Sequence, residues 1–186
     1  MPDPYCYRGS TVLRNRLGLR DEAALDAYEA EQVTQRLVEP LPSGRLSVTH
    51  YRAIHRHVFG DVYPWAGQLR RVRIAKGGSM FCYPEHIQAE LARVFGTLRD
   101  IGYLAGLPAG AFAEGAAHFL AELNAIHPFR DGNGRTQLAF MATLANAAGH
   151  TLDFQRLDPE AFLAAMIASF QGDEGPLVGA LRGLLG

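Results

Sequence analysis

The sequence predicts a mainly α-helical domain that carries one small β-hairpin. Several stretches repeat apolar residues at the spacing of one helix face, whereas only the segment 70–83 alternates charged and apolar residues as a half-buried strand does. The 186 residues contain no repeat, low-complexity tract or linker, and this length suffices for a sizeable core. We therefore expect a single domain over residues 1–186.

The first half of the chain should form two helices, the hairpin and a third helix. The helices are expected over 25–38 and 48–59, separated by the turn residues Pro40-Leu-Pro-Ser-Gly44. Lys76-Gly-Gly78 has the composition of the hairpin's turn. A helix over about 84–99 should begin with a proline, which is tolerated there because its missing N–H would be unpaired anyway.

The second half should contain four more helices. The first, over 112–126, should end where Pro128 disfavours the helical conformation of the residue before it. The next covers 136–148. Its apolar face consists of Leu138, Phe140, Met141 and Leu144. A helix capped by Asp158 and one that starts near Gly175-Pro176 complete the chain.

The segment His127-Pro-Phe-Arg-Asp-Gly-Asn-Gly-Arg135 combines groups that suit phosphoryl chemistry. Its last five residues open a helix, whose N-terminus offers unpaired N–H groups and the positive end of the helix dipole. Gly132 and Gly134 allow the backbone to close around an anion. Arg135 can donate to two phosphate oxygens, and Asn133 adds a neutral donor.

The same segment contains a candidate metal ligand and a candidate base. Asp131 would repel a phosphate unless Mg²⁺ lay between them. His127 titrates near neutral pH and could accept a proton from an attacking hydroxyl. Each feature also has a structural interpretation, because a histidine at a helix end is often a cap and Asp-Gly-Asn-Gly could be an ordinary turn. Phe129 is expected to pack under the loop. The joint pattern favours function, since few structural needs would place these residue types at these offsets.

The nine residues from His127 to Arg135 resemble the signature loop of the Fic family, whose members typically transfer AMP from ATP-Mg²⁺ to a hydroxyl side chain of a target protein. The segment Tyr7–Leu19 resembles the lead-in of the bacterial toxin-like and effector-like group. Further segments are similar to the family's β-hairpin flap and its approach: Tyr63–Gly67, Arg70, Ile74–Gly77, Phe81 and Ile87. The resemblance implies a Fic-type helical domain with a lead-in over about 1–45, a flap over about 70–83 and a signature loop over 127–135.

The resemblance also implies a role for each matching position. His127 would be the general base, and Asp131 would bind Mg²⁺ or Mn²⁺ bridging the α- and β-phosphates of ATP or another nucleotide. The phosphates would be held by Gly132, Asn133, Gly134 and Arg135. The residues that dock the target would be Lys76, Gly77, Gly78, Ser79 and Phe81. An exposed strand edge can add a peptide strand with little dependence on side chains. The hairpin alone favours an ordinary solvent-facing hairpin, and the motif downstream reverses that preference.

Leu138 departs from the family pattern, because Fic nucleotidyltransferases usually carry a second arginine at this position. Arg135 and Leu138 share one helix face, so the missing cation would have pointed toward the phosphate tail. Its hydrogen bond would contribute about 1.5–3 kcal/mol, roughly ten- to a hundredfold in triphosphate affinity. Alternatively, Leu138 joins Phe140 and Met141 in the core.

Several hypotheses about the donor are compatible with a leucine at position 138. ATP remains the first choice of donor, with a substitute cation such as Arg130, Arg70, Arg71 or Arg73. Another nucleotide or a diphosphate donor, giving phosphocholine or phosphate transfer, is the alternative, as is a catalytically weakened nucleotide-binding module. A phosphotransferase or toxin antagonist acting on a small molecule would need a closed pocket at His127. A pure binding module would not need that base.

A family feature that the chain lacks is the inhibitory pattern Ser/Thr-x-x-x-Glu-Gly/Asn. No serine or threonine of the sequence is followed by a glutamate four residues later. Inhibition in cis is therefore not expected, and the resemblance implies a small separate antitoxin that would supply the inhibitory helix in trans.

The composition is typical of a compact enzyme and argues against nucleic acid and membranes as partners. The net charge of −1 implies no bulk attraction to nucleic acid or to an anionic membrane. The sequence has no basic start followed by an apolar stretch and no apolar run of about 20 residues. Cys6 and Cys82 are too few for a disulfide framework and fit no metal motif. We expect a cytoplasmic protein, or one delivered into a host cell if it belongs to a secreted effector, acting on a Ser, Thr or Tyr hydroxyl.

Overall fold

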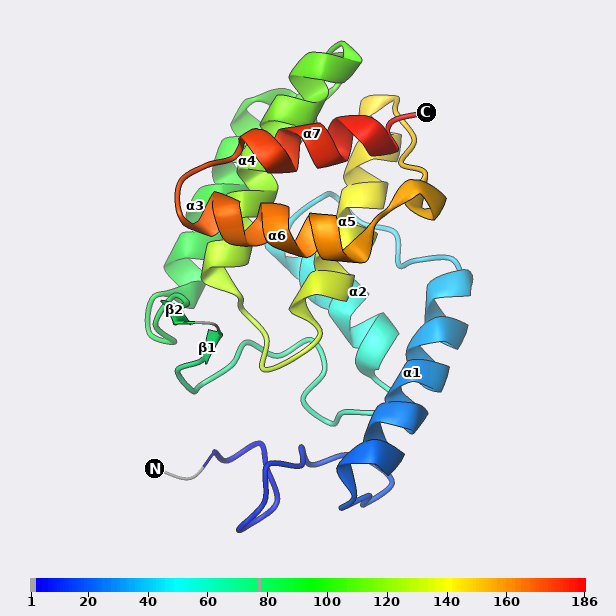
Figure 1. The fold of residues 1–186 in the computed structure, drawn as a ribbon, viewed down its shortest axis with the longest axis vertical. Coiled ribbons are helices and arrows are strands. Elements are labelled where there is room, and N and C mark those ends of the chain that lie inside the picture. The colour runs from blue at the N-terminus through cyan, green and yellow to red at the C-terminus, as the bar shows by residue number, and fades with distance from the viewer. Residues whose placement is uncertain (1–2, 77) are drawn as a thin grey trace.

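The computed structural model describes residues 3–186 except Gly77, and it is mainly helical with one two-stranded hairpin (Figure 1). The predicted fold class is confirmed. The elements in chain order are α1 (Glu22–Val38), α2 (Val48–Phe59), β1 (Ala75–Lys76), β2 (Ser79–Met80), α3 (Ile87–Asp100), the 3₁₀-helix η1 (Gly102–Leu104), α4 (Ala109–Ile126), α5 (Asn133–Ala148), the 3₁₀-helix η2 (Phe154–Arg156), α6 (Pro159–Phe170) and α7 (Gly175–Leu184). Gly77, expected in the flap turn, lies outside the described residues.

Helix boundaries follow local capping groups. The bounds of α2 are those predicted, and its N-cap Ser47 accepts a hydrogen bond from the N–H of His50. Helix α1 begins three residues earlier than predicted, because Asp21 caps it by accepting from the N–H of Ala24. Helix α5 also begins three residues early, at Asn133. The last residues of the signature loop are therefore already the first helical turn.

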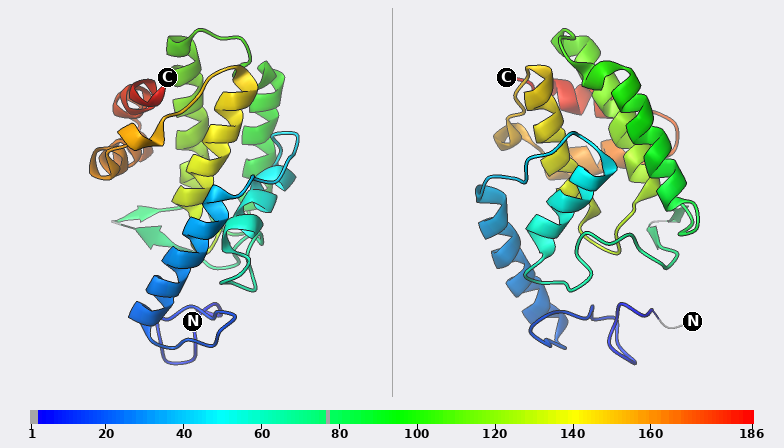
Figure 2. Two further views of the ribbon diagram at one scale, coloured as in Figure 1. Left: turned by 90° about the vertical axis from the view of Figure 1, so that its right-hand side faces the viewer. Right: turned by 180° about the vertical axis from the view of Figure 1, so that it is seen from behind.

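Helix α4 is the central element of the bundle. It contacts α3, α5, α6 and α7, and α2 packs on α5 and α1. The buried core brings together four aromatic rings, one from each of α2, α3, α4 and α5: Tyr51, Phe95, Phe119 and Phe140. Figure 2 shows α6 and α7 packed side by side over one face of the bundle.

The segment that joins α4 to α5 lies at the same end of the bundle as the flap (Figure 1). The N-terminal segment crosses below this end and is fastened to it by an ion pair between Asp3 and Arg130 at 2.7 Å. Ala75 and Lys76 of the flap pair antiparallel with Met80 and Ser79. In the part of the chain that the structure describes, no helix is long and apolar enough to cross a membrane.

Candidate active site

Two glycines of the signature loop differ in what the fold demands of them. Gly132 has φ +75° at the N-cap of α5, and a Cβ there would lie 2.4 Å from the ring of Phe59. The fold therefore requires glycine at this position. Gly134 is exposed, and no atom lies within 4 Å of a Cβ placed on it. The space above the first turn of α5 is thus open to a ligand.

The side chain of Asn133 braces the loop. It is 3% exposed, accepts the Phe129 N–H at 2.9 Å and donates to the Phe129 carbonyl at 2.9 Å. Phe129 is fully buried, as predicted, and its ring lies 3.8 Å from that of His55 and 5.3 Å from that of Tyr51. Because its side chain serves the loop, the group that Asn133 offers to an anion is its backbone N–H at the start of α5.

His127 is held with one ring nitrogen free. It ends α4 in the left-handed conformation, with φ +47°, and its Nδ1 lies 3.1 Å from the carbonyl oxygen of Asn124. Since a carbonyl only accepts, Nδ1 carries the proton and Nε2 retains its lone pair. Burial lowers the pKa of His127 to about 4, so the ring is neutral at pH 7. Such a ring can accept a proton.

Phe81 does not have the role expected of a docking residue. It is 8% exposed, and its ring stacks on His127 with centroids 3.9 Å apart and an angle of 14° between the planes. It also forms a T-shaped pair with Phe170 of α6, with ring centroids 5.6 Å apart. The side chain of Phe81 therefore positions the candidate base instead of facing a target.

Asp131 is the carboxylate of the loop. Its side chain is 46% exposed and accepts the N–H of Gly132. Among the residues the structure describes, no group of three or more His, Cys, Asp or Glu side chains is placed to hold a metal ion. Asp131 would therefore be a lone protein ligand, and this fits a Mg²⁺ whose remaining ligands are water and phosphate oxygens.

A buried histidine that the sequence did not single out holds the backbone of Asp131. His55 of α2 accepts the Gly67 N–H at Nδ1, 2.8 Å away, and its Nε2 lies 3.0 Å from the carbonyl oxygen of Asp131. The first bond fixes the proton on Nε2, which donates to Asp131. Burial lowers the pKa of His55 to about 4, so the neutral form persists at pH 7.

Arg135 is oriented by a second residue missed in the sequence. Its guanidinium pairs with Glu29 of α1 at 2.6 Å and lies over the Phe59 ring, 4.6 Å from the centroid. The hydroxyl of Tyr63 donates to the other oxygen of Glu29. No inhibitory sequence pattern surrounds Glu29, yet it places a carboxylate on the arginine of the loop. The sequence places Glu29 on a predicted helix, but it gives no sign that this helix lies next to Arg135, which is far away in the chain.

The pattern that describes the Fic/DOC family matches residues 45–145, more than half of the chain. The chain belongs to the Fic/DOC family. It is 51% identical over 184 residues to the probable protein adenylyltransferase y4lH of Sinorhizobium fredii, covering 98% of this chain and 96% of that protein. It is 39% identical over 173 residues to the probable protein adenylyltransferase Fic of Escherichia coli, covering 92% and 86%. The crystal structure of the BepC protein of Bartonella tribocorum with bound AMPPNP superposes with a TM-score of 0.91 at 30% identity, covering 98% and 96%.

Two of the arginines considered as substitutes for the second Fic arginine are already engaged. Arg70 is 2% exposed, and its guanidinium donates to the carbonyls of Val72, Cys82, Ile126 and His127. Its own N–H donates to the carbonyl of Pro128 at 2.9 Å. Arg70 thus ties the flap to the Fic loop and is no phosphate ligand. Arg130 is paired with Asp3.

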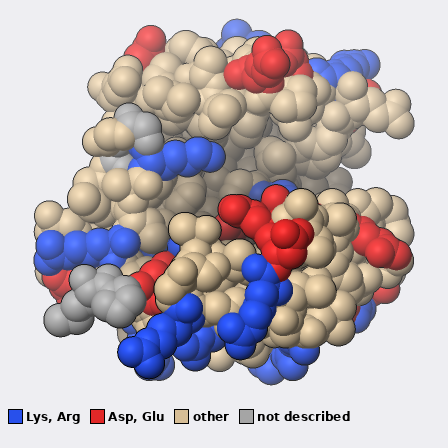
Figure 3. Space-filling model, turned by 60° about the horizontal axis from the view of Figure 1, so that its bottom comes forward, with Lys and Arg blue, Asp and Glu red and all other residues tan. Residues whose placement is uncertain are grey.

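Other cations lie on the flap and its approach. Arg73 lies over the Tyr83 ring at 4.2 Å, and Arg71 is exposed. Lys76 of β1 is also exposed and lies close enough to His127 to contribute to its lowered pKa. The end of the bundle on which the flap and loop lie is hollowed, with charged side chains of both signs around the hollow (Figure 3). Of these exposed cations, Lys76 is the one whose charge acts on the ring of His127.

Leu138 is half-buried, in contrast to Phe140 and Met141, which are fully buried. The expectation that it joins these two residues in the core is therefore met only in part. A larger polar side chain at this position would start from a partly exposed site on the first turns of α5. Leu138 therefore supplies neither a cation to the phosphate site nor a fully buried core residue.

Proposed function

We propose that this protein is a protein adenylyltransferase, which transfers AMP from ATP to a hydroxyl side chain of a target protein. The observation that carries the proposal is the neutral ring of His127, whose Nε2 is free and which lies six residues before the open helix N-terminus at Asn133 and Gly134. The similarity to two probable protein adenylyltransferases and the AMPPNP bound in BepC support this function and this nucleotide.

Each residue of the loop would have one task. His127 Nε2 accepts the proton of the target hydroxyl, whose oxygen attacks the α-phosphorus. The bond from that phosphorus to the oxygen bridging to the β-phosphate breaks, and pyrophosphate leaves with the electron pair. The N–H groups of the first turn of α5 and the Arg135 guanidinium hold the phosphates. A Mg²⁺ or Mn²⁺ held by Asp131 would neutralise charge on them.

The flap would present the target. Ala75, Lys76 and Met80 are exposed on a hairpin that ends at Phe81, directly against His127. An extended target segment paired along this edge would bring a Ser, Thr or Tyr hydroxyl to Nε2. The residues of the flap other than Phe81 would contribute mainly through their backbone groups.

The proposed function includes an inhibitory partner protein and a cellular location. An antitoxin that supplies a glutamate in trans would have to approach Arg135, which Glu29 already engages. We further propose that the 186 residues act as one domain in the cytoplasm of the producing cell or of a host. Leu138 keeps open a second candidate, a donor other than ATP, because it removes a cation from the phosphate site.

A labelling experiment separates these reactions. The protein is incubated with a lysate and with ATP labelled at the α-phosphate, ATP labelled at the γ-phosphate, α-labelled GTP, CTP or UTP, or labelled CDP-choline. Adenylyl transfer attaches the α-label of ATP to protein and releases the γ-label with pyrophosphate. Transfer of the γ-label would instead establish phosphate transfer. Incorporation from none of the donors, at any target concentration, would contradict an enzyme of this class.

A further inference from the structure

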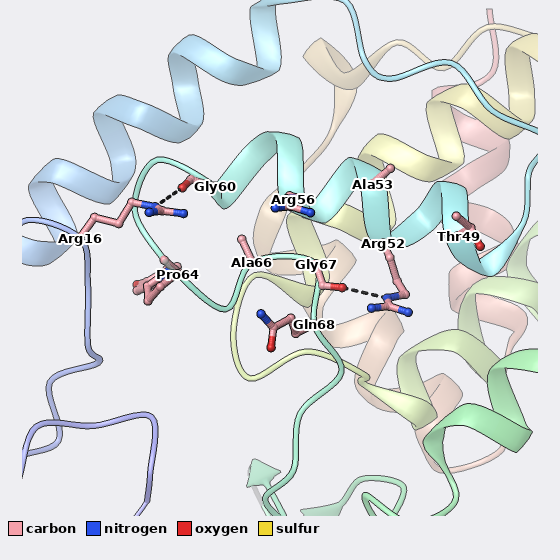
Figure 4. A pocket seen from close by; sticks show the side chains of 11 residues that line it. Arg16, Thr49, Arg52, Ala53, Arg56, Gly60, Pro64, Ala66, Gly67 and Gln68 are labelled. Atoms are coloured by element: carbon pink, nitrogen blue, oxygen red, sulfur yellow. Dashed lines mark hydrogen bonds between the residues drawn. The ribbon is translucent and has the colours of Figure 1, made fainter.

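A cavity of about 350 Å³ lies away from the Fic loop, between α2 and the segment 60–68 (Figure 4). It is on the outer side of α2, because Arg52 and Arg56 of this helix line it and are exposed, whereas His55 and Phe59 face the core. No residue of the signature loop lines the cavity. Its volume is within the range of small-molecule sites.

The lining of this pocket is cationic. Three of its residues are arginines, Arg16, Arg52 and Arg56, and none is acidic. Many other arginines of the chain pair with carboxylates, whereas these three have no salt bridge among the described residues. Asp61 is close enough to Arg16 for its own pKa to be lowered by it, but this carboxylate is bonded to Arg36. Arg52 and Arg56 also form an i, i+4 pair of like charge, which is unfavourable without a counter-ion.

Two of the guanidinium groups are held in place. Arg16 Nε donates to the Gly60 carbonyl at 2.6 Å, and Arg52 Nε donates to the Gly67 carbonyl at 2.8 Å. In both, the terminal nitrogens are left to bind a ligand. The side chains of Thr49 and Gln68 also line the pocket. Fixed guanidinium groups suit phosphate oxygens, because two parallel N–H groups match two oxygens.

A chain of two hydrogen bonds connects this pocket to the active site. Gly67 has φ +76° and packs so tightly on α2 that a Cβ would lie 2.9 Å from the Arg52 carbonyl and from Arg56 Cβ. Its N–H donates to His55, which in turn donates to the carbonyl of Asp131. A shift of Gly67 would therefore be transmitted to the backbone of the candidate metal ligand.

We propose that this pocket is a second anion site, which binds a ligand with a di- or oligophosphate group, and that its occupation is transmitted through Gly67 and His55 to Asp131. Three permanent cations around one small cavity balance the charge of a diphosphate. A single surface arginine would bind any anion weakly, whereas three that line one pocket favour a ligand with two or more linked phosphates. Binding at this pocket does not depend on the proposed function, because the pocket lies outside the loop, whereas the role of its coupling to Asp131 rests on that function.

The first test measures binding of sodium pyrophosphate by calorimetry. The Arg135→Gln variant is used as the background, so that binding at the Fic loop is weakened. Adding Arg52→Gln and Arg56→Gln should weaken the remaining pyrophosphate binding at least tenfold. The control adds Arg8→Gln and Arg45→Gln, which remove the same number of charges at two exposed arginines outside the pocket, and it should change the pyrophosphate affinity less than twofold. Melting temperatures show that each variant is folded.

Three results would overturn the proposal. Equal pyrophosphate affinity of the pocket variant and the control would place the ligand elsewhere. Sulfate binding as tight as pyrophosphate would reduce the pocket to a general cation cluster. A hexaglutamate peptide that displaces pyrophosphate at lower concentration would make it a docking site for an acidic protein segment.

The second test reads the coupling without using activity. The amide resonances of Gly67 and Gly132 are followed during the pyrophosphate titration, since the Gly132 N–H donates to the carboxylate of Asp131. Both should shift in the Arg135→Gln background and neither in the pocket variant. A shift of Gly67 alone would mean that the pocket binds the anion but does not communicate with the loop.

Discussion

The signature loop and the flap meet at His127, yet they are built in opposite ways. The loop is fixed by buried polar groups from three directions: Asn133 within the loop, His55 from α2 and Arg70 from the approach to the flap. The flap has two strands of two residues each, and its described side chains, Phe81 apart, are largely exposed. The chemistry thus lies on a pre-organised segment, and recognition lies on an adaptable one.

The largest expected effect is that of removing the base from the rigid side. His127→Ala should reduce transfer about 10²–10⁴-fold, because the general base acts on the attacking hydroxyl. Nucleotide affinity should stay within a few-fold, since the ring makes no bond to the phosphate cradle. Single-turnover labelling with α-labelled ATP measures the first quantity and calorimetry the second. Undiminished labelling would show that another group takes the proton.

Substitutions at the two loop glycines separate a requirement of the fold at Gly132 from a requirement of nucleotide binding at Gly134. Gly132→Ala forces a Cβ against Phe59 at a positive φ and should cost about 1–3 kcal/mol of unfolding free energy, or roughly 2–4 °C in Tm for each kcal/mol. Gly134→Ala meets nothing and should keep its Tm, while the KM for ATP rises because the methyl group occupies the approach to the helix N-terminus. Equal Tm losses in both variants would contradict this division.

The sequence predicted the residues of the signature loop, but not the distant residues that hold the loop in place. The loop, Phe129 and the bounds of α2 could be predicted, because glycine, proline and apolar spacing act locally. Glu29, His55, the stacking of Phe81 and the role of Arg70 could not, since each depends on an element brought from far along the chain. Arg70 shows this best: among alternating residues it resembles a surface arginine, and only the fold surrounds it with carbonyl groups.

Leu138→Arg tests whether the loop still has the shape for a second cation. Because Leu138 is only half-buried, the arginine should be tolerated and should tighten ATP binding up to roughly ten- to a hundredfold. Leu138→Gln is the matched control, with a polar side chain but no charge. A lower Tm together with unchanged ATP affinity would mean that the site is shaped for another donor.

The pH dependence of stability tests the two buried histidines together. The pKa values of His55 and His127 are about 4 in the folded protein, below the value of about 6.5 that histidine has when unfolded. The unfolded state therefore binds more protons between these values, and the unfolding free energy should fall as the pH drops from about 6.5 to about 4. The loss should be on the order of 3 kcal/mol for each histidine. Urea unfolding across this range measures it.

A variant assigns that loss. His55→Gln should make the dependence on pH shallower, because it removes one of the two buried histidines. Transfer should remain near its neutral rate down to about pH 5, since His127 is still unprotonated there. A slope that is the same in wild type and His55→Gln would show that other groups cause the acid loss.

The smallest expected effects separate two adjacent residues of the flap. Phe81 stacks on His127, whereas Met80 is 51% exposed on β2. Phe81→Leu should lower the transfer rate several-fold and move the acidic limb of its pH profile upward, because a thinner cover leaves the ring better hydrated and raises its pKa. Met80→Thr keeps the strand propensity and should change the rate less than about twofold, because a target strand pairs with the backbone. If Met80→Thr weakens labelling of one target and not of another, side chains of the flap select the target, and the adaptable region of the enzyme is more specific than its backbone pairing requires.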